Sequence, residues 1–429
     1  MSLLERLLKN DFVRDIAKLV SGTTVAQAIP FLLLPLFTRL YSPDDFASFE
    51  QFLMLTEILV IPATLKYEFA IMQPKRDSDA KQLLYFVLLF CLLISLLYSL
   101  IGFATAPFIS ELLNNPDARV FVPLVGVSVF LLGCHLAFNY WFSRRKRYGL
   151  LGTNKVIETS SGEGAKIAYR YGGFENLGLI YGFLTGRLIM VATYAWRYRR
   201  GNKHRRFSFK ASQVKSLVKE YSDYPRFTTW GSLFGRSTAW MHIFLFSIYF
   251  EPIVGFIALA RRLAFAPMSI ISQSFAQVFY QRISEVDNAE EIQRIYDRSL
   301  RPLVVFSVAA IVLVHLLPGN TITFFFGDRW GLAQPYIEIL IFWFVANFIS
   351  TCFAFIFLRL KKQKQMLQLD ILHLILVVLS IYTGIWLELG AQTTLIIFSA
   401  TQTAFYIFMI LLGRSYVKQL AHQKEDNGS

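Results

Sequence analysis

Residues 224–280 read YPRFTTWGSLFGRSTAWMHIFLFSIYFEPIVGFIALARRLAFAPMSIISQSFAQVFY, two consecutive apolar segments that are interrupted by arginines. The first segment contains Arg236, a short break follows at 251–252, and the second contains Arg261 and Arg262. A cation near the bilayer centre costs at least about 2.5 kcal/mol, so it normally faces a wet cavity or a partner. We therefore interpret this hairpin as one wall of a cationic cavity inside a membrane protein. The alternative for each arginine is snorkelling to a headgroup layer or pairing with a structural carboxylate.

The composition points to a polytopic membrane protein. Hydrophobic residues make up 55% of the chain and charged residues only 17%, whereas a soluble globular domain carries about 25% charged residues. The 43 Lys and Arg exceed the 29 Asp and Glu, but they fall mostly between apolar segments. The positive-inside rule therefore explains the basic excess, and nucleic acid is not predicted as a partner. The three cysteines lie singly in apolar runs, so neither a disulfide framework nor a metal cluster is predicted.

Segments long enough to cross a bilayer recur along the whole chain, because about 20 apolar residues span a 30 Å hydrocarbon core. About twelve such spans are predicted: 16–40, 46–66, 83–103, 120–142, 150–169, 177–196, 225–250, 253–280, 303–325, 336–358, 367–387 and 393–413. The sequence thus predicts an all-α integral membrane protein.

Loop charges set the expected orientation. Alternate connections are basic, among them 144–147 and 359–364, and Lys and Arg are enriched in cytoplasmic loops. Both chain ends are then cytoplasmic, and the longest basic loop bisects the chain. We expect an amphipathic cytoplasmic N-terminus at 1–15, a six-helix bundle at 16–196, a basic cytoplasmic linker at 197–222, a second six-helix bundle at 223–413 and a cytoplasmic tail at 414–429.

The fifth and sixth spans have unusual patterns. The fifth contains Asn154, Lys155, Glu158, Glu163 and Lys166, too many polar residues to meet lipid, so it must be shielded by other helices or line water. An extramembrane helix is the alternative, but it would place the next basic loop on the wrong side. The sixth carries Gly178, Gly182 and Gly186, a small-residue face that favours close helix packing.

An enzyme would need a constellation of reactive groups, and the sequence has none of the familiar ones. It lacks HExxH, CxxC, a complete glycine-rich phosphate loop and a G-x-S-x-G elbow. We therefore predict no catalytic residue, no metal site and no cofactor. Active transport would use an H⁺ or Na⁺ gradient or a substrate sink.

The candidate site residues are charged groups inside the spans or at their ends. The cations are Arg236, Arg261, Arg262, Lys66 and Lys166, and the cavity or coupling carboxylates are Glu57, Glu158, Glu163 and Glu68. For Lys66 and Glu68 an interfacial position is the alternative. Several cations with a few carboxylates suit an anionic substrate, because the cations offset the desolvation of a phosphate.

Three stretches carry a resemblance to one family. Residues 39–46 (RLYSPDDF) and 66–75 (KYEFAIMQPK) resemble "TRLYSPEDFG" and "RYExAIxLP" of the bacterial Wzx-type polysaccharide flippases. These belong to the superfamily that also holds the MATE drug exporters and the lipid II flippases. Residues 254–262 (VGFIALARR), with the later AQVFY, are similar to the family's "VGxYxLAxR…P…QVFY". Lys66 stands where arginine is usual and loses the bidentate fork for phosphate. Ala47 stands where glycine is usual.

The resemblance implies a MATE-like fold of two six-helix bundles around a V-shaped central cavity. The implied cargo is an undecaprenyl-pyrophosphate-linked oligosaccharide, moved by alternating access from the cytoplasmic to the periplasmic leaflet of the bacterial inner membrane. The implied product is a surface polysaccharide such as O-antigen of lipopolysaccharide, capsule or exopolysaccharide, and the implied partners are polymerase and chain-length regulator proteins.

Two other functions compete with this reading. A cation-coupled small-molecule or drug exporter of the MATE type would need a cavity dominated by carboxylates and aromatics. Arginines in the seventh and eighth spans would repel cationic drugs. A membrane-embedded glycosyl transferase would need large periplasmic loops, but the longest outer loop is only 318–334.

Overall fold

The computed structural model describes residues 11–174, 177–201, 209–250, 253–286, 288–360 and 362–426. These residues form helices and turns, and no strand occurs among them. The all-α class predicted from the sequence is confirmed. Residues 1–10 of the expected amphipathic N-terminus lie outside the described ranges, and the first described helix, α2, begins at Asp11.

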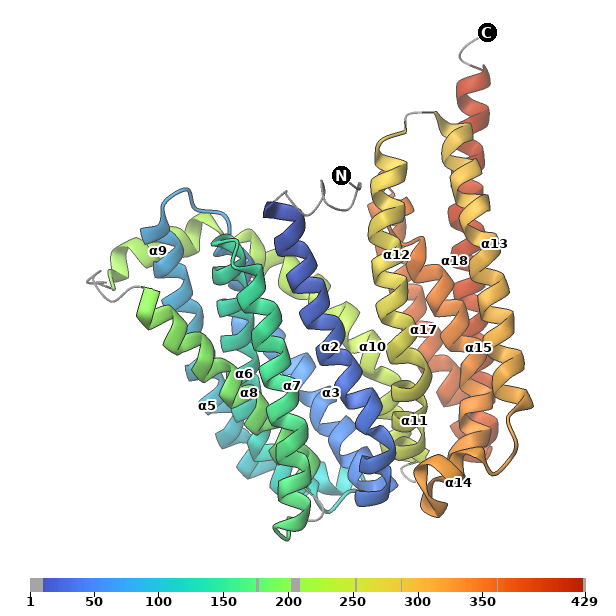
Figure 1. Cartoon of the computed structure of the whole chain (residues 1–429), viewed down its shortest axis with the longest axis horizontal. Helices are drawn as coiled ribbons and strands as arrows, with labels where there is room; N and C mark the ends of the chain where they lie inside the picture. The colour runs from blue at the N-terminus through green and yellow to red at the C-terminus, as the bar shows by residue number, and fades with distance from the viewer. Residues whose placement is uncertain are drawn as a thin grey trace, which may run out of the picture. The chain divides into compact units, whose positions relative to one another are not determined.

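The chain divides into two compact units, Met1–Trp240 and Met241–Ser429. Figure 1 labels their helices. The N-terminal unit contains α2 (Asp11–Leu40), α3 (Pro43–Thr64), α4 (Tyr67–Ala70), α5 (Asp77–Leu112), α6 (Ala118–Arg144), α7 (Tyr148–Tyr171), α8 (Gly178–Gly201), α9 (Ala211–Glu220), the π-helical η1 (Tyr224–Thr228) and the first half of α10 (Thr229–Tyr249).

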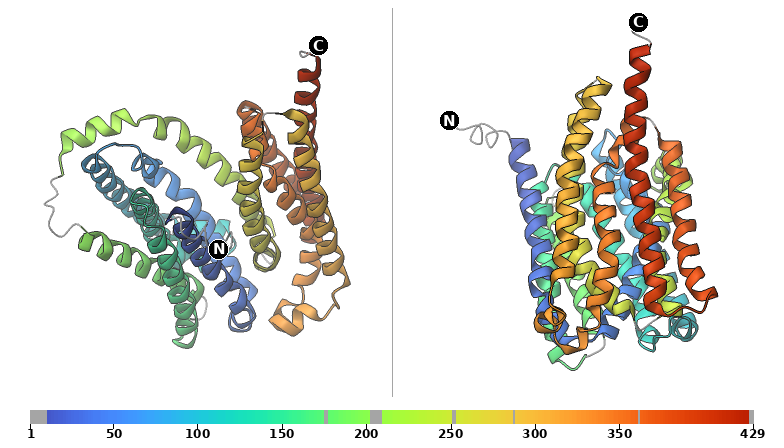
Figure 2. Two further views of the ribbon diagram at one scale, coloured as in Figure 1. Left: turned by 45° about the horizontal axis from the view of Figure 1, so that its top comes forward. Right: turned by 90° about the vertical axis from the view of Figure 1, so that its right-hand side faces the viewer.

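The C-terminal unit begins within α10. It contains α11 (Val254–Ala260), the π-helical η3 (Arg261–Phe265), α12 (Ala266–Ser284), α13 (Ala289–Leu316), α14 (Thr321–Phe326), η4 (Asp328–Trp330), α15 (Ala333–Cys352), α16 (Phe355–Arg359), α17 (Gln363–Trp386) and α18 (Ala391–Asp426). Figure 2 shows the long α18, in red, and it packs on α15 and α17.

The division falls at Trp240, downstream of the expected 197–222 linker. The reason is that α9 packs on α5 and buries Val214 and Leu217, two apolar residues about one turn apart. Tyr67 also donates a hydrogen bond to the Val218 carbonyl, 2.9 Å away. The described part of the basic connection is thus attached to the N-terminal unit.

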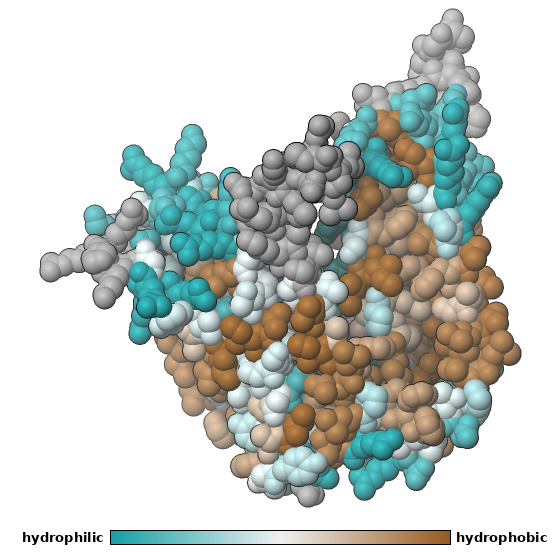
Figure 3. Space-filling view, in the orientation of Figure 1, coloured by the Kyte–Doolittle hydropathy of each residue, from teal (hydrophilic) through white to brown (hydrophobic). Residues whose placement is uncertain are grey.

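Within the described residues, ten helical segments are long and apolar enough to cross a membrane. The expected spans 150–169 and 225–250 correspond to α7 and α10, with 24 and 21 residues, which are too polar to be among the ten. The count of twelve spans therefore stays a prediction. On the C-terminal unit, Figure 3 shows apolar residues (brown) around the middle of the helices and hydrophilic residues (teal) near their ends, the pattern of a multi-pass membrane protein.

The ninth expected span, 303–325, has different bounds in the structure. Helix α13 starts much earlier, at Ala289, and ends at Leu316. Leu317 is extended, with φ −63° and ψ 134°, because a residue that precedes proline is pushed out of the helical region. Residues Thr321–Phe326 then form the separate helix α14.

Helix α7 lies between α2 and α8 in the N-terminal unit (Figure 1). Glycines permit the close approach of α7 and α8. A Cβ on Gly186 would lie 2.5 Å from the Glu158 carbonyl oxygen, and one on Gly182 would lie 2.6 Å from the Lys166 backbone nitrogen. Both distances are shorter than any side chain tolerates. The small-residue face predicted for the sixth span is therefore confirmed as a packing surface.

Candidate functional site

The charged residues of α7 point into the N-terminal unit. Its buried positions recur at intervals of three or four residues, which places them on the face covered by α2 and α8. Glu158, Glu163 and Lys166 are only 8%, 6% and 9% exposed. The prediction that other helices shield the fifth span is confirmed. Because these three charged residues are buried, the outward face of α7 carries fewer charges than its sequence contains.

Ion pairs inside the unit neutralise these buried charges. Glu158 lies 2.7 Å from the Lys155 ammonium and 3.1 Å from Nε of Arg187 on α8. Glu163 lies 2.7 Å from the Lys166 ammonium. Each charge of a buried pair needs its partner. Removing one partner leaves an unpaired buried charge and costs about 3 to 5 kcal/mol of stability. This arrangement favours a structural role for Glu158, Glu163 and Lys166, and their place in a transport cavity stays a prediction.

Sequence reasoning missed Arg187. It lies in the sixth predicted span, so an intramembrane cation was a signal that could have been used. Its guanidinium is 8% exposed in the structure and lies 4.6 Å from the Phe183 ring centroid, with Glu158 on the neighbouring helix. Only the packing of α8 on α7 reveals which carboxylate it meets.

Arg236 and Glu57 form a different kind of pair. Arg236 Nη1 on α10 lies 3.6 Å from Glu57 Oε2 on α3, and both residues belong to the N-terminal unit. Their side chains are 49% and 25% exposed. Glu57 lies seven residues before the end of α3 at Thr64, and Arg236 seven residues after the start of α10 at Thr229. At 1.5 Å rise per residue, each is roughly 10 Å inside its helix end.

Lys66 and Glu68 occupy a strained turn between α3 and α5. Leu65 and Lys66 both have left-handed backbones, with φ 48° and 59°. The Lys66 ammonium lies 3.6 Å from Glu68 Oε1 and 5.3 Å from the Phe69 ring centroid. The Glu68 side chain is only 1% exposed. Burial raises the pKa of Glu68, and the nearby Lys66 charge opposes that shift.

Arg261 and Arg262 open the π-helical η3 in the C-terminal unit and are half-buried. A π-helical turn inserts one extra residue into a helix and is frequent at functional sites. The structure therefore brings together Arg236 with Glu57 and Lys66 with Glu68, whereas these two arginines belong to the other unit. Substrate binding by these candidates stays a prediction.

Comparison with known proteins defines the class of protein. The solved structure of the lipid II flippase MurJ in an inward closed conformation matches with a TM-score of 0.73 and 13% identity over 94% of this chain and 89% of that one. An inward-facing MATE multidrug resistance transporter of the MOP superfamily matches with a TM-score of 0.67 and 16% identity over 94% and 95%. A MOP superfamily transporter from Pyrococcus furiosus matches with a TM-score of 0.59 and 14% identity over 97% and 98%. These likenesses show that the chain shares the fold of these three proteins.

The family follows from the sequence. The profile of the family described as "Polysaccharide biosynthesis protein" matches residues 36–335, a range that contains every candidate site residue. No curated protein matches the chain. The chain belongs to this polysaccharide biosynthesis family, the Wzx-type flippases.

Proposed function

We propose that this protein moves an undecaprenyl-pyrophosphate-linked oligosaccharide from the cytoplasmic to the periplasmic leaflet of the bacterial inner membrane by alternating access. Membership of the polysaccharide biosynthesis family supports the flippase class. A pyrophosphate needs cations where it leaves water, and its sugars need a wet route. The surface polysaccharide that receives the sugars, whether O-antigen, capsule or exopolysaccharide, belongs to this proposal.

The observation that carries the proposal is the pair of Arg236 and Glu57. Among the paired intramembrane charges described above, it is the one with a half-exposed cation, and its 3.6 Å separation exceeds hydrogen-bond range. Glu57 compensates the guanidinium while no cargo is bound. A phosphate oxygen then replaces the carboxylate and gains charge-assisted hydrogen bonds from the same arginine.

The exchange of partners also supplies a route to ion coupling. When Arg236 turns to the pyrophosphate, Glu57 loses its counter-charge inside the membrane. A proton or a sodium ion at that carboxylate restores neutrality. An inward H⁺ or Na⁺ gradient can in this way return the site to its empty state.

The test is made on Arg236→Lys and Arg236→Ala, with two measurements for each variant. One is the amount of folded protein in the membrane, and the other is surface polysaccharide display in a strain that lacks its flippase. Display should rank Arg, then Lys, then Ala, with about a tenfold or greater loss for Ala, because a charge-assisted hydrogen bond contributes about 1.5 to 3 kcal/mol. Abundance should stay normal.

Arg294→Ala is the matched control. Arg294 pairs with Glu290 on α13, with side chains 68% and 48% exposed, and such a surface pair contributes less than about 1 kcal/mol. It should leave display and abundance unchanged. Low abundance of Arg236→Ala, or full display for both Arg236 variants, would remove Arg236 from the site. Loss of resistance to cationic drugs with intact display would favour the MATE-type exporter instead.

A further inference from the structure

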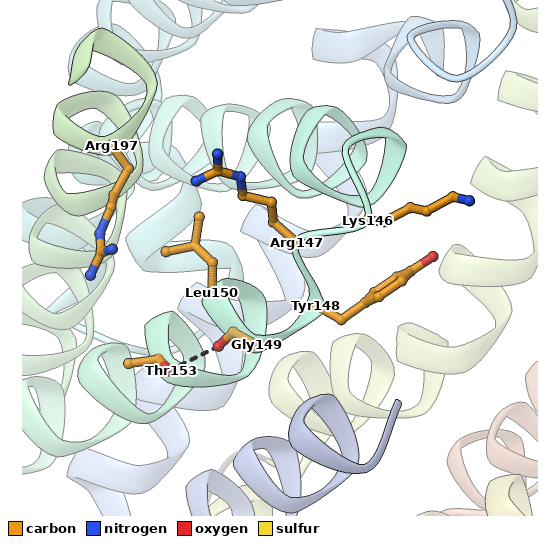
Figure 4. Close-up of a pocket in the computed structure, with 7 residues that line it drawn as sticks. All are labelled: Lys146, Arg147, Tyr148, Gly149, Leu150, Thr153 and Arg197. Atoms are coloured by element: carbon orange, nitrogen blue, oxygen red, sulfur yellow. Dashed lines mark hydrogen bonds between the residues drawn. The ribbon is translucent and has the colours of Figure 1, made fainter. Parts of the chain in front are cut away.

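A cavity of about 320 Å³ lies in the N-terminal unit where the turn between α6 and α7 approaches the C-terminal part of α8 (Figure 4). Its lining residues are Lys146, Arg147, Tyr148, Gly149, Leu150, Thr153 and Arg197. One water occupies about 30 Å³ of liquid, so the cavity has room for a small polar group such as a phosphate with its neighbouring atoms. The site proposed for the cargo shares no residue with it.

The cavity carries positive charge for which the side chains that the structure describes provide no carboxylate partner. The two preceding arginines share one carboxylate, since Arg144 and Arg145 lie 3.3 and 2.9 Å from Asp77. In contrast, Arg147 and Arg197 have no carboxylate partner within the described ranges. In Figure 4 both arginines extend on the side of Leu150 and Thr153, while Lys146 and Tyr148 extend away from them. The side that holds the two arginines therefore attracts an anion.

The amino terminus of α7 adds to the positive electrostatic potential of the cavity. Helix α7 is 24 residues long and begins at Tyr148, with Arg147 as its N-cap. The Arg147 side chain makes no capping hydrogen bond. The first N–H groups of a helix lack intrahelical acceptors and carry the positive end of its dipole. Thr153 Oγ1 donates to the Gly149 carbonyl, 2.9 Å away, and holds the first turn together.

The turn that leads into the cavity holds a lysine at a costly position. Lys146 has φ 55°, its N–H donates to the Ser143 carbonyl at 2.8 Å, and the Arg147 N–H donates to the Phe142 carbonyl at 3.0 Å. This is the helix-ending motif in which glycine or asparagine normally occupies the left-handed residue. Asparagine would therefore occupy this position with less backbone strain than lysine.

An aromatic residue beside the cavity is of the type found at headgroup depth. Trp196, next to Arg197, is 49% exposed, and the guanidinium groups of Arg197 and Arg200 lie 5.4 and 4.6 Å from its ring centroid. Tryptophan is enriched at the membrane–water interface, and basic residues at the cytoplasmic one. The sequence predicts the 144–147 turn on the cytoplasmic side, where anionic headgroups meet basic pockets between helices.

We propose that this cavity binds the phosphate group of an anionic membrane lipid at the predicted cytoplasmic surface. The two arginines would hold the phosphate, the α7 amino terminus would add to the field, and Leu150 with Trp196 would meet the apolar part of the lipid. A free phosphate offers the same chemistry, and the exposed Trp196 favours the lipid as its source. The proposal does not depend on the identity of the cargo.

The experiment uses the purified full chain and two probes. Retention of dioleoyl phosphatidylglycerol is compared with that of zwitterionic dioleoyl phosphatidylcholine by native mass spectrometry, and inorganic pyrophosphate is added as a soluble competitor. The wild-type chain should retain phosphatidylglycerol over phosphatidylcholine by about tenfold or more. A tenfold ratio corresponds to about 1.4 kcal/mol. Arg147→Gln combined with Arg197→Gln should abolish this preference. Lys146→Asn should leave folding and most of the preference intact, because Lys146 extends away from the two arginines and asparagine accepts the left-handed backbone.

Lys215→Gln is the matched control, since Lys215 is an exposed cation of α9 in the same unit and outside the cavity. Loss in the arginine variant with normal retention in the control supports the lipid site. Displacement by pyrophosphate, with no preference between the two lipids, supports the phosphate site and assigns it to a soluble ligand. Equal loss in Lys215→Gln, or unchanged preference in the arginine variant, overturns the proposal. Polysaccharide display is not the readout, so a wrong cargo would not affect the result.

Discussion

In the N-terminal unit, stability is most sensitive to the loss of a buried charged residue or of its partner. Glu158 shows the principle, because it meets Lys155 on its own helix and Arg187 on the next. Such a carboxylate stabilises the fold only while both cations remain. Glu57 is different, since its partner Arg236 stays half exposed and can exchange it for a ligand. Exposure of the paired carboxylate thus separates the two kinds of charge, because the Glu57 side chain is 25% exposed and that of Glu158 only 9%.

Glu68 should make stability depend on pH. Burial raises the pKa of Glu68 in the folded protein above the ordinary carboxyl value of about 4.3. The fold therefore favours the protonated acid, and its contribution to stability is present at acidic pH and lost as pH rises through the folded pKa. Glu68→Gln cannot ionise. Near pH 8 it should raise the free energy of unfolding relative to wild type by roughly 1 kcal/mol or more, measured as a higher thermal unfolding midpoint. Near pH 4 it should give no gain.

Glu111→Gln is the control for this comparison, because Glu111 is an exposed carboxylate of the same unit. Thermal unfolding of the purified proteins at both pH values should show no pH-dependent difference for that variant. A Glu68→Gln protein that is less stable than wild type near pH 8 would mean that the ionised carboxylate is well paired with Lys66. The direction assigned to its pKa would then be wrong.

At the scale of elements, the contact of α7 with α8 decides whether the polar helix can be buried. Gly186 leaves no room for a methyl group, since a Cβ there would lie 2.5 Å from the Glu158 carbonyl oxygen and 2.8 Å from Gly162 Cα. Both neighbours are backbone atoms, which cannot turn aside as a flexible side chain does. The Glu158–Arg187 ion pair depends on the same approach.

Gly186→Ala should therefore reduce the folded protein in the membrane, because overpacking typically costs about 1 to 3 kcal/mol. Gly164→Ala on α7 is the matched control, since no atom lies within 4 Å of a Cβ placed there. It should be neutral or raise stability by about 0.5 to 1 kcal/mol, the helical advantage of alanine over glycine. Membrane abundance and thermal unfolding measure both. Equal abundance of the two variants would show that the helices are not packed this closely.

The helices were largely predictable from the sequence, but their partners were not. Hydrophobic length and loop charge identified even the polar helix α7, and glycine spacing identified the packing face of α8. The encounter of Glu158 with Arg187 is a contact between helices, which no local spacing encodes. The bounds of α13 were misplaced because hydropathy continues through Pro318, whereas the backbone restriction imposed by proline ends the helix at Leu316.

At the scale of the molecule, each unit has its own packed interior. The N-terminal unit buries an aromatic and aliphatic cluster that includes Tyr67, Trp141 and Tyr194. In the C-terminal unit, Tyr296 stacks on Phe353 with ring centroids 4.1 Å apart and donates a hydrogen bond to the Ile410 carbonyl at 2.9 Å. Alternating access, as proposed, requires two bodies that keep their interiors while their arrangement changes. The separate cores meet that requirement.

The orientation of both units in the membrane follows from their loop charges and can be tested with single cysteines. Tyr171 is 77% exposed and Asn320 is exposed in loops predicted to be periplasmic, whereas Ser78 and Ser284 are exposed on the predicted cytoplasmic side. Tyr171→Cys and Asn320→Cys should react with an impermeant thiol reagent in intact cells with permeable outer membranes. Ser78→Cys and Ser284→Cys should react only after lysis.

The three native cysteines are buried, so the wild-type chain should give little background reaction. Each unit contributes one position on either side, and the two results are therefore independent. Both should agree, because the six spans predicted for the first unit would give the second the same orientation. A reversed pattern would move the Arg147–Arg197 cavity to the periplasmic face. It would therefore overturn the proposal of a lipid site at the cytoplasmic surface.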